Sequence, residues 1–344
     1  MNDNASFVSV LGPTITQYLA LKLALGRCYY GERRILVSLD ASLATQDSDL
    51  TSGSFAHWCQ SQEHLRSGVR RNRMRIVRNL TLYRRRREPS CFVPDPALFP
   101  PLHQPVRPYI FTHGEIVRLY HAAKALEPSQ VCPLRAEVFS LAVALLYTTG
   151  LRRGELLRMT IGDYDPREKT LLVRESKFHK SRLLPLSPDG AHLLERYLQV
   201  RRVLRLSVSP ETPLIGNHRS GGRAYTGVGF SYVVRRLFEN AGVLKPDRRL
   251  PRIHDIRHTF AVHALLRWYL AGVDVQARLP FLAIYMGHVS IVSTQHYLQL
   301  IEPLASLASE RFASQCAGLI EPLPIFPEEI HDSEAAQPSG PCPT

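Results

Sequence analysis

A proline-rich stretch constrains the fold of this chain more than any other feature. Residues 89–109, PSCFVPDPALFPPLHQPVRPY, repeat proline too often for a regular helix or a central strand. The stretch therefore predicts a linker at 91–108, between an N-terminal domain at 1–90 and a second domain that begins near residue 109. A chain of 344 residues is long enough for two ordinary domains.

The segment just before this linker is strongly basic. Residues 66–87, RSGVRRNRMRIVRNLTLYRRRR, contain ten arginines and no acid. Apolar residues recur among them at helical spacing, which predicts an amphipathic helix with a cationic face. The face could be merely solvated, but a run of one charge sign repels itself and favours an anionic partner. The residues then expected to contact DNA phosphates are Arg70, Arg71, Arg73, Arg75, Arg78, Arg84 and Arg85.

The overall charge also indicates a polyanionic partner. The formal net charge is +13, which favours nucleic acid or an anionic membrane surface, and nucleic acid is the better interpretation. No run approaches the roughly 18 apolar residues that span a bilayer, and the first residues lack the basic region of a secretory signal. Six cysteines at irregular spacing are expected to be reduced thiols, and no disulfide scaffold is expected.

The second domain is expected at 109–315 and reads as mainly α with a small antiparallel sheet. Thr112 and Glu115 form a capping box, and AEVFSLAVALLYTTG reads as a buried helix that ends at Gly150. The segments TLLVRES and SRLLPLS alternate like two strands of a hairpin, joined by the basic turn KFHK. Ser187 caps a following helix. Residues 316–344 are expected to form a disordered tail.

Six residues of this domain could act together on a phosphate group. Each has an ordinary structural explanation when taken alone. The pentapeptide HDIRH at 254–258 also resembles a metal site, although an arginine within it would repel a divalent cation. The six candidates are Arg152, Lys177, His254, Arg257, His288 and Tyr297.

The order and spacing of these residues resemble the tyrosine recombinase (phage integrase) family over roughly residues 10 to 310. The matching motifs are TGLRRGELL, the HxxR box of HDIRH, and GHVSIVSTQHY, in which the tyrosine follows the histidine by nine residues. The resemblance implies a two-domain DNA clamp, with a helical, SAM-like core-binding domain followed by a catalytic integrase domain. The long interval between Arg257 and His288 is similar to that of recombinases from transposons and other mobile elements, and Met286 replaces a usual leucine.

The resemblance implies DNA cleavage and rejoining through a 3′-phosphotyrosine, without metal, ATP or any other cofactor. Tyr297 would attack phosphorus, while Arg152 and Arg257 bind nonbridging oxygens. Lys177 would protonate the leaving 5′ oxygen, with Lys180 as the alternative. The remaining roles are proton transfer or an oxygen contact for His254, a further hydrogen bond for His288, and orientation of the site for Glu155.

Three alternatives stay open at this point. A metal-dependent hydrolase would use His254, Asp255 and His258, which otherwise are structural or support the site. A DNA-binding architectural protein would have lost catalysis. A type IB topoisomerase would run the same chemistry as a monomer.

The expected partners follow from the chemistry of strand exchange. Exchange between two double-stranded recombination sites requires four cleavages, so we expect a homotetramer on two sites, with accessory recombinases as further partners and no membrane. Residues 301–320 have helical periodicity and would dock on a neighbouring subunit or on their own domain. Such a protein is expected in the bacterial cytoplasm, at the nucleoid.

Overall fold

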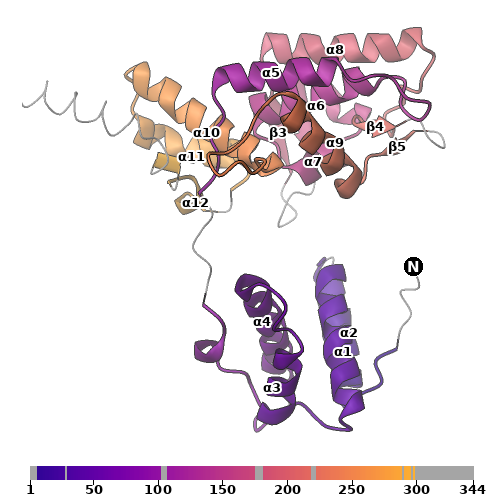
Figure 1. Cartoon of the computed structure of the whole chain (residues 1–344), viewed down its shortest axis with the longest axis vertical. Helices are drawn as coiled ribbons and strands as arrows, with labels where there is room; N and C mark the ends of the chain where they lie inside the picture. Colours follow the sequence, from indigo (N-terminus) through magenta and orange to yellow (C-terminus); the bar gives the residue numbers. More distant parts are fainter. Residues whose placement is uncertain are drawn as a thin grey trace, which may run out of the picture. The chain divides into compact units, whose positions relative to one another are not determined.

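The chain consists of two compact, mostly helical units. A computed structural model describes residues 6–27, 29–101, 107–174, 181–217, 222–288, 290–295, 297 and 298. The units are Met1–Arg107 and Pro108–Thr344, and the small sheets of the second are antiparallel (Figure 1). The expected fold class is therefore confirmed. No helix in these described ranges is long and apolar enough to cross a membrane.

Unit 1 is built from helices α1 (Gly12–Ala24), α2 (Tyr30–Thr45), α3 (Ser52–Gln60) and α4 (Ser67–Arg84). Their shared core includes Trp58, which is fully buried, and leucines of α2 and α4. The predicted basic helix is α4, and its buried side carries Met74, Ile76, Val77 and Leu80 at the expected spacing. Val69, in contrast, is 45% exposed.

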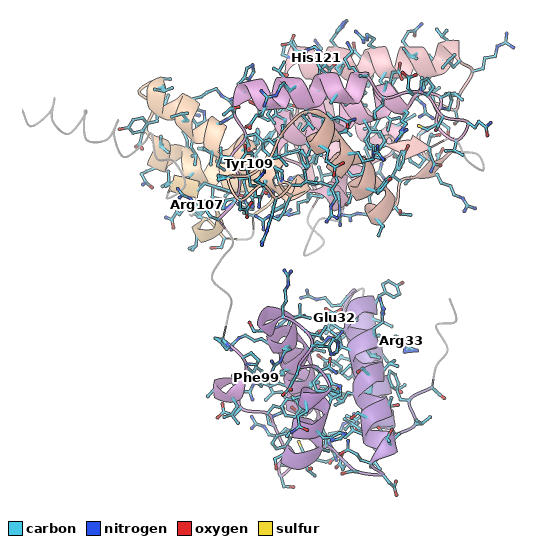
Figure 2. All side chains as sticks on the ribbon, in the orientation of Figure 1. Glu32, Arg33, Phe99, Arg107, Tyr109 and His121 are labelled. Carbon is cyan, nitrogen blue, oxygen red and sulfur yellow. The ribbon has the colours of Figure 1, made fainter. Side chains whose placement is uncertain are left out.

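The proline-rich stretch packs against unit 1 over its first part. It forms the short 3-10 helix η1 (Pro96–Leu98), and Phe99, labelled in Figure 2, is 8% exposed within the unit 1 core. Arg71 of α4 donates to the carbonyl of Pro100 at 2.8 Å, and Arg78 donates to the carbonyl of Pro94 at 2.7 Å. The residues expected as a linker from position 91 are thus part of a folded unit up to Pro101.

Unit 2 begins where local cap signals predict. Helix α5 (His113–Lys124) starts with the capping box of Thr112 and Glu115. Helix α6 (Arg135–Thr149) ends at Gly150, whose φ of +61° is the left-handed conformation that glycine adopts most readily. Helix α8 (Pro188–Val203) is capped by Ser187, which accepts a hydrogen bond from the backbone of Gly190.

The predicted hairpin forms and gains a third strand. Strands β2 (Thr170–Val173) and β3 (Arg182–Pro185) pair antiparallel with Leu171 opposite Leu184, and both leucines are buried. Strand β1 (Tyr164–Asp165), which sequence reasoning missed, pairs with β2. The other elements of unit 2 before residue 250 are α7 (Arg153–Arg158), η2 (Ile161–Asp163), β4 (Gly216–Asn217), β5 (Arg223–Ala224) and α9 (Gly227–Asn240).

Three helices complete unit 2 around a second apolar cluster. They are α10 (Ile253–Leu270), α11 (Val275–Met286) and α12 (Val292–Gln295), grouped at one end of the unit (Figure 1). Leu265, Met286 and Tyr297 belong to their shared cluster. This packing brings the HDIRH segment, the Gly-His pair and the candidate nucleophile together. The predicted tail and the segment 301–320 lie outside the described residues.

Candidate active site

Two arginines from distant motifs bind the same turn at the end of α11. The Nη2 atom of Arg152 donates to the carbonyl of Gly287 at 2.9 Å. The Nη2 atom of Arg257 donates to the carbonyl of Met286 at 2.6 Å, and its Nη1 donates to the carbonyl of Gly150 at 2.5 Å. The TGLRRGELL, HDIRH and MGH segments are therefore joined by direct hydrogen bonds.

Helix termination explains why these carbonyls are available. The last carbonyls of an α-helix have no partner within the helix. Both α6 and α11 end at a glycine in the left-handed conformation, Gly150 and Gly287, where the chain turns away and leaves carbonyls for other donors. The two glycines of the motifs thus create the acceptors that fix the arginines.

A buried carboxylate holds Arg152 from its other side. Glu155 is 4% exposed, and its Oε1 accepts from Nη1 of Arg152 at 2.7 Å while its Oε2 accepts from the backbone of the same residue at 3.0 Å. Arg182 of β3 also donates to both carboxylate oxygens, at 3.2 and 2.9 Å. Burial raises the pKa of Glu155, but hydrogen bonds from Arg182 and Arg152 outweigh it and lower the pKa to about 2. Glu155 is therefore expected to be ionised at neutral pH, where it accepts hydrogen bonds from both Arg152 and Arg182.

Arg257 is a charged side chain that is almost completely buried. Its side chain is 2% exposed, and burial together with the positive charge of Arg152 lowers its pKa to about 10, so it stays protonated at neutral pH. Arg152 and Arg182 bond the carboxylate of Glu155, and Arg257 is close enough to interact electrostatically with it and with both other arginines. This local excess of positive charge suits an anionic group such as a phosphate.

Tyr297 lies between two histidines of different segments. Its hydroxyl shares a hydrogen bond with Nδ1 of His258 at 3.2 Å, and its ring is stacked at 6.0 Å on that of His288. Tyr297 is 3% exposed, and burial raises its pKa, although the nearby charges of Arg257 and Arg152 oppose that effect. The candidate nucleophile therefore lies near both Arg152 and Arg257.

The histidines of the site are poor bases. Burial, with additional effects from neighbouring positive charges, lowers the pKa of His258 and of His288 to about 4 each. Nδ1 of His288 is hydrogen-bonded to Oγ1 of Thr294 in α12 at 2.7 Å. The pKa of His254, at the start of α10, is lowered as well, first by desolvation of its ring and then by the charges of Arg257 and Arg252. All three imidazoles are expected to be neutral at pH 7.

Asp255 has a structural role at the start of α10. It is completely buried, and its carboxylate accepts from the backbone and the guanidinium of Arg252, with Nη2 at 2.7 Å from Oδ1. A metal-dependent hydrolase would need the carboxylate of Asp255 as a ligand, but this carboxylate is paired with Arg252 at the helix start. In the described ranges of the chain, no three His, Cys, Asp or Glu side chains form a metal-binding group.

A basic cavity of about 720 Å³ opens beside this cluster. Arg152 and His254 line it, so it is continuous with the candidate site. Arg153 reaches it from α7 and is held by Ser231 at 2.7 Å. The other charged residues of its wall, none of them predicted from the sequence, are Arg235, Arg249 and Arg252.

The predicted DNA-contacting arginines of α4 divide into two groups. Besides Arg71 and Arg78, two others have partners within unit 1, because Arg73 bonds Gln62 and Arg84 pairs with Asp49 at 2.6 Å. Such intramolecular bonds occupy the donors that a phosphate would need. Of the other three, Arg75 is exposed and bonds Oδ1 of Asn72 in its own helix at 2.9 Å, Arg85 is exposed, and Arg70 is half-buried.

Sequence reasoning missed Arg182, and the predicted Lys177 lies outside the described residues, as does Lys180. A signal for Arg182 was present, since side chains two apart in a strand share a face and Leu184 is buried. His258 was weighed as structural, although it stands four residues after His254 and therefore on the same side of α10. Its bond to Tyr297 could not be read from the sequence.

The chain is similar to known recombinases in sequence. The sequence model of the phage integrase family matches residues 110–302. The putative integrase/recombinase y4rB of Sinorhizobium fredii is 30% identical over 295 residues, which cover 85% of this chain and 93% of that protein. A tyrosine recombinase XerC of Roseiflexus is 32% identical over 222 residues, or 60% of this chain and 65% of its own length.

Solved structures share the fold at lower identity. The Tn1549 transposon integrase in complex with transposon right end DNA has a TM-score of 0.60 at 16% identity, covering 87% of this chain and 99% of that one. The XerH site-specific recombinase bound to its difH substrate has a TM-score of 0.60 at 18% identity, covering 80% and 77%. The predicted resemblance is confirmed, and this chain belongs to the phage integrase family of tyrosine recombinases.

Proposed function

We propose that this protein is a site-specific DNA recombinase that cleaves and rejoins strands through a phosphotyrosine at Tyr297. The observation that supports this most is the joint attachment of Arg152 and Arg257 to the carbonyls of Gly287 and Met286, with Tyr297 beside them. A metal-free phosphoryl transfer needs cationic donors fixed in place next to a nucleophile, and this cluster has both.

In this proposal each residue of the site has one task. Attack by the hydroxyl of Tyr297 forms the bond to phosphorus and expels the 5′ oxygen, so the phosphodiester energy is kept in a 3′-phosphotyrosine and no ATP is required. Arg152 and Arg257 stabilise the charge on the nonbridging oxygens, and Lys177 protonates the leaving oxygen. His254 and His288, as neutral imidazoles, donate hydrogen bonds to the phosphate, and Glu155 orients Arg152.

Double-stranded DNA is the proposed partner, contacted by both units. In unit 2 the basic cavity beside Arg152 would take phosphates that flank the scissile one. In unit 1 Arg75 of α4 and Arg85 at its C-terminal end are exposed, so they are better placed for phosphates than the half-buried arginines that bond other segments of the unit. Strand exchange then requires four protomers on two sites, and the substrates would be the ends of a mobile element.

Covalent capture on DNA tests the proposal. The protein would first select a binding site from a randomised duplex pool, and duplexes with that site and a nick at successive positions would then be incubated with it in excess EDTA. We expect a denaturant-resistant protein–DNA adduct at one nick position. Binding without any adduct would favour an architectural protein, and activity that needs added zinc or manganese would favour a hydrolase. Relaxation of supercoiled DNA by the monomer would favour a topoisomerase.

A further inference from the structure

Arg182 is a buried arginine that belongs to none of the recognised motifs. It is the first residue of β3, and its side chain is 9% exposed. All three of its guanidinium nitrogens donate hydrogen bonds, two to Glu155 and Nε to the carbonyl of Tyr285 at 2.8 Å. A buried charge of this kind is costly unless it is fully paired, so its position is tightly fixed.

The hydrogen bonds of Arg182 link it to Arg152 in two ways. Glu155 accepts from Arg182 on one side and from Arg152 on the other. Arg152 in turn donates to Gly287, two residues after the carbonyl of Tyr285 that binds Arg182. The two arginines are thus held by one carboxylate and by one turn of the chain.

The guanidinium of Arg182 packs directly against the backbone of Gly287. Gly287 has a φ of +67°, and a Cβ atom there would lie 2.8 Å from Nη1 of Arg182. Glycine is therefore favoured at this position by its backbone conformation, and any larger residue would displace the guanidinium of Arg182. His288 follows directly, so Arg182 also supports the turn from which that histidine extends.

We propose that Arg182 is a positioning residue for DNA cleavage, which holds Glu155 so that Arg152 presents its guanidinium in one orientation. The inference rests on the proposed function, because it assumes that Arg152 stabilises the phosphate. Arg182 itself is too buried to reach DNA, and it acts through Glu155. It also anchors the start of β3 to the turn before His288 through the carbonyl of Tyr285.

Geometry more than charge should decide what can replace Arg182. A lysine keeps the positive charge but has a single nitrogen, and it cannot bond both oxygens of Glu155 and the carbonyl of Tyr285 in one plane. Arg182→Lys should therefore fold while holding Arg152 less firmly. Loss of alignment at a reacting centre typically costs on the order of 100-fold in rate.

The experiment is a double-mutant cycle on adduct formation. The rate of the covalent complex and the affinity for the selected duplex are measured for wild type, Arg182→Lys, Arg152→Lys and the double variant, with thermal unfolding as the check on folding. Arg174→Lys is the matched control, since Arg174 lies in the same hairpin and pairs with buried Asp163, but is 62% exposed and outside the site.

We expect Arg182→Lys to slow adduct formation on the order of 10- to 100-fold with unchanged DNA affinity, while Arg174→Lys keeps the wild-type rate. In the Arg152→Lys background the Arg182→Lys change should cause little further loss of rate, because the guanidinium that Arg182 helps to orient is already absent. Additive losses, or a wild-type rate for Arg182→Lys, would overturn the inference while leaving the proposed function intact. Absence of an adduct in the wild type would remove both.

Discussion

The hydroxyl of Tyr297 and Nδ1 of His258 lie 3.2 Å apart, which joins the closing motif of the chain to the last residue of HDIRH. His258 also packs edge-on against His254, with ring centroids 4.7 Å apart. Since burial and the neighbouring His254 lower the pKa of His258 to about 4, its neutral ring can accept the tyrosine proton in a hydrogen bond at pH 7. In the proposed mechanism, HDIRH would therefore orient the nucleophile through His258 as well as bind the phosphate through Arg257.

A first prediction concerns this hydrogen bond. His258→Ala removes the acceptor and should slow adduct formation on the order of ten-fold, the value of one well-placed hydrogen bond. His258→Asn offers an amide oxygen near the position of Nδ1 and should keep more of the rate. His263→Asn is the control, because His263 makes a similar bond to Tyr147 at 3.1 Å away from the site. Equal, wild-type rates for Ala and Asn would show that the contact has no role in cleavage.

The pH dependence of stability provides a second prediction. Burial lowers the pKa of His258 and His288 to about 4 each, from 6.5 in an exposed chain. Between these values the unfolded state binds more protons than the folded state, so the free energy of unfolding should fall as pH decreases from about 6.5 to about 4. Urea titrations across this range measure it. Replacing both histidines with asparagine should flatten the slope, and an unchanged slope would contradict the burial of these rings.

The arginines of α4 should separate into two classes on substitution. Arg71→Ala and Arg78→Ala break hydrogen bonds to the proline-rich stretch and should each cost about 1 kcal/mol of stability. Arg75→Ala and Arg85→Ala should leave stability unchanged but weaken binding to duplex DNA, each lowering the salt dependence by about one phosphate contact. Fluorescence anisotropy at several salt concentrations measures the second effect. Loss of stability in the exposed pair would reverse this assignment.

A fourth prediction tests Lys177 as the general acid. Replacing the 5′ bridging oxygen of the scissile phosphate with sulfur gives a leaving group that needs no proton. Lys177→Ala should therefore cleave ordinary DNA very slowly and recover on the sulfur-substituted duplex, whereas Arg152→Ala should recover little. If Lys180→Ala is the variant that recovers, and Lys177→Ala behaves like wild type on ordinary DNA, the acid is Lys180.

Features with local signals were predictable from the sequence. The capping box at Thr112, the glycine end of α6 at Gly150 and the Ser187 cap each depend on a few adjacent residues, and all three are confirmed. The buried side of α4 followed from its 3.6-residue period. The three segments that meet at the end of α11 were recognised because their residue types and order are specific.

Pairings between distant residues were not predictable in the same way. Glu155 and Arg182 are separated by 27 positions, and nothing local in either segment indicates the other. The same holds for Arg78 of α4, which donates a hydrogen bond to the carbonyl of Pro94, 16 residues away in a stretch expected to be a linker. A charged side chain in a sequence shows that a partner is needed, but only the fold decides whether that partner is a phosphate or the protein itself.

Substitution of Tyr297 shows whether its hydroxyl is the group that attacks the phosphate. Tyr297→Phe keeps the ring that packs beside His288 and removes only the hydroxyl, so it should bind the nicked duplex with wild-type affinity and form no covalent complex on a denaturing gel. Tyr147→Phe, which breaks a similar tyrosine–histidine bond at 3.1 Å elsewhere in unit 2, should form the complex normally. An adduct of undiminished yield from Tyr297→Phe would show that another residue attacks the phosphate.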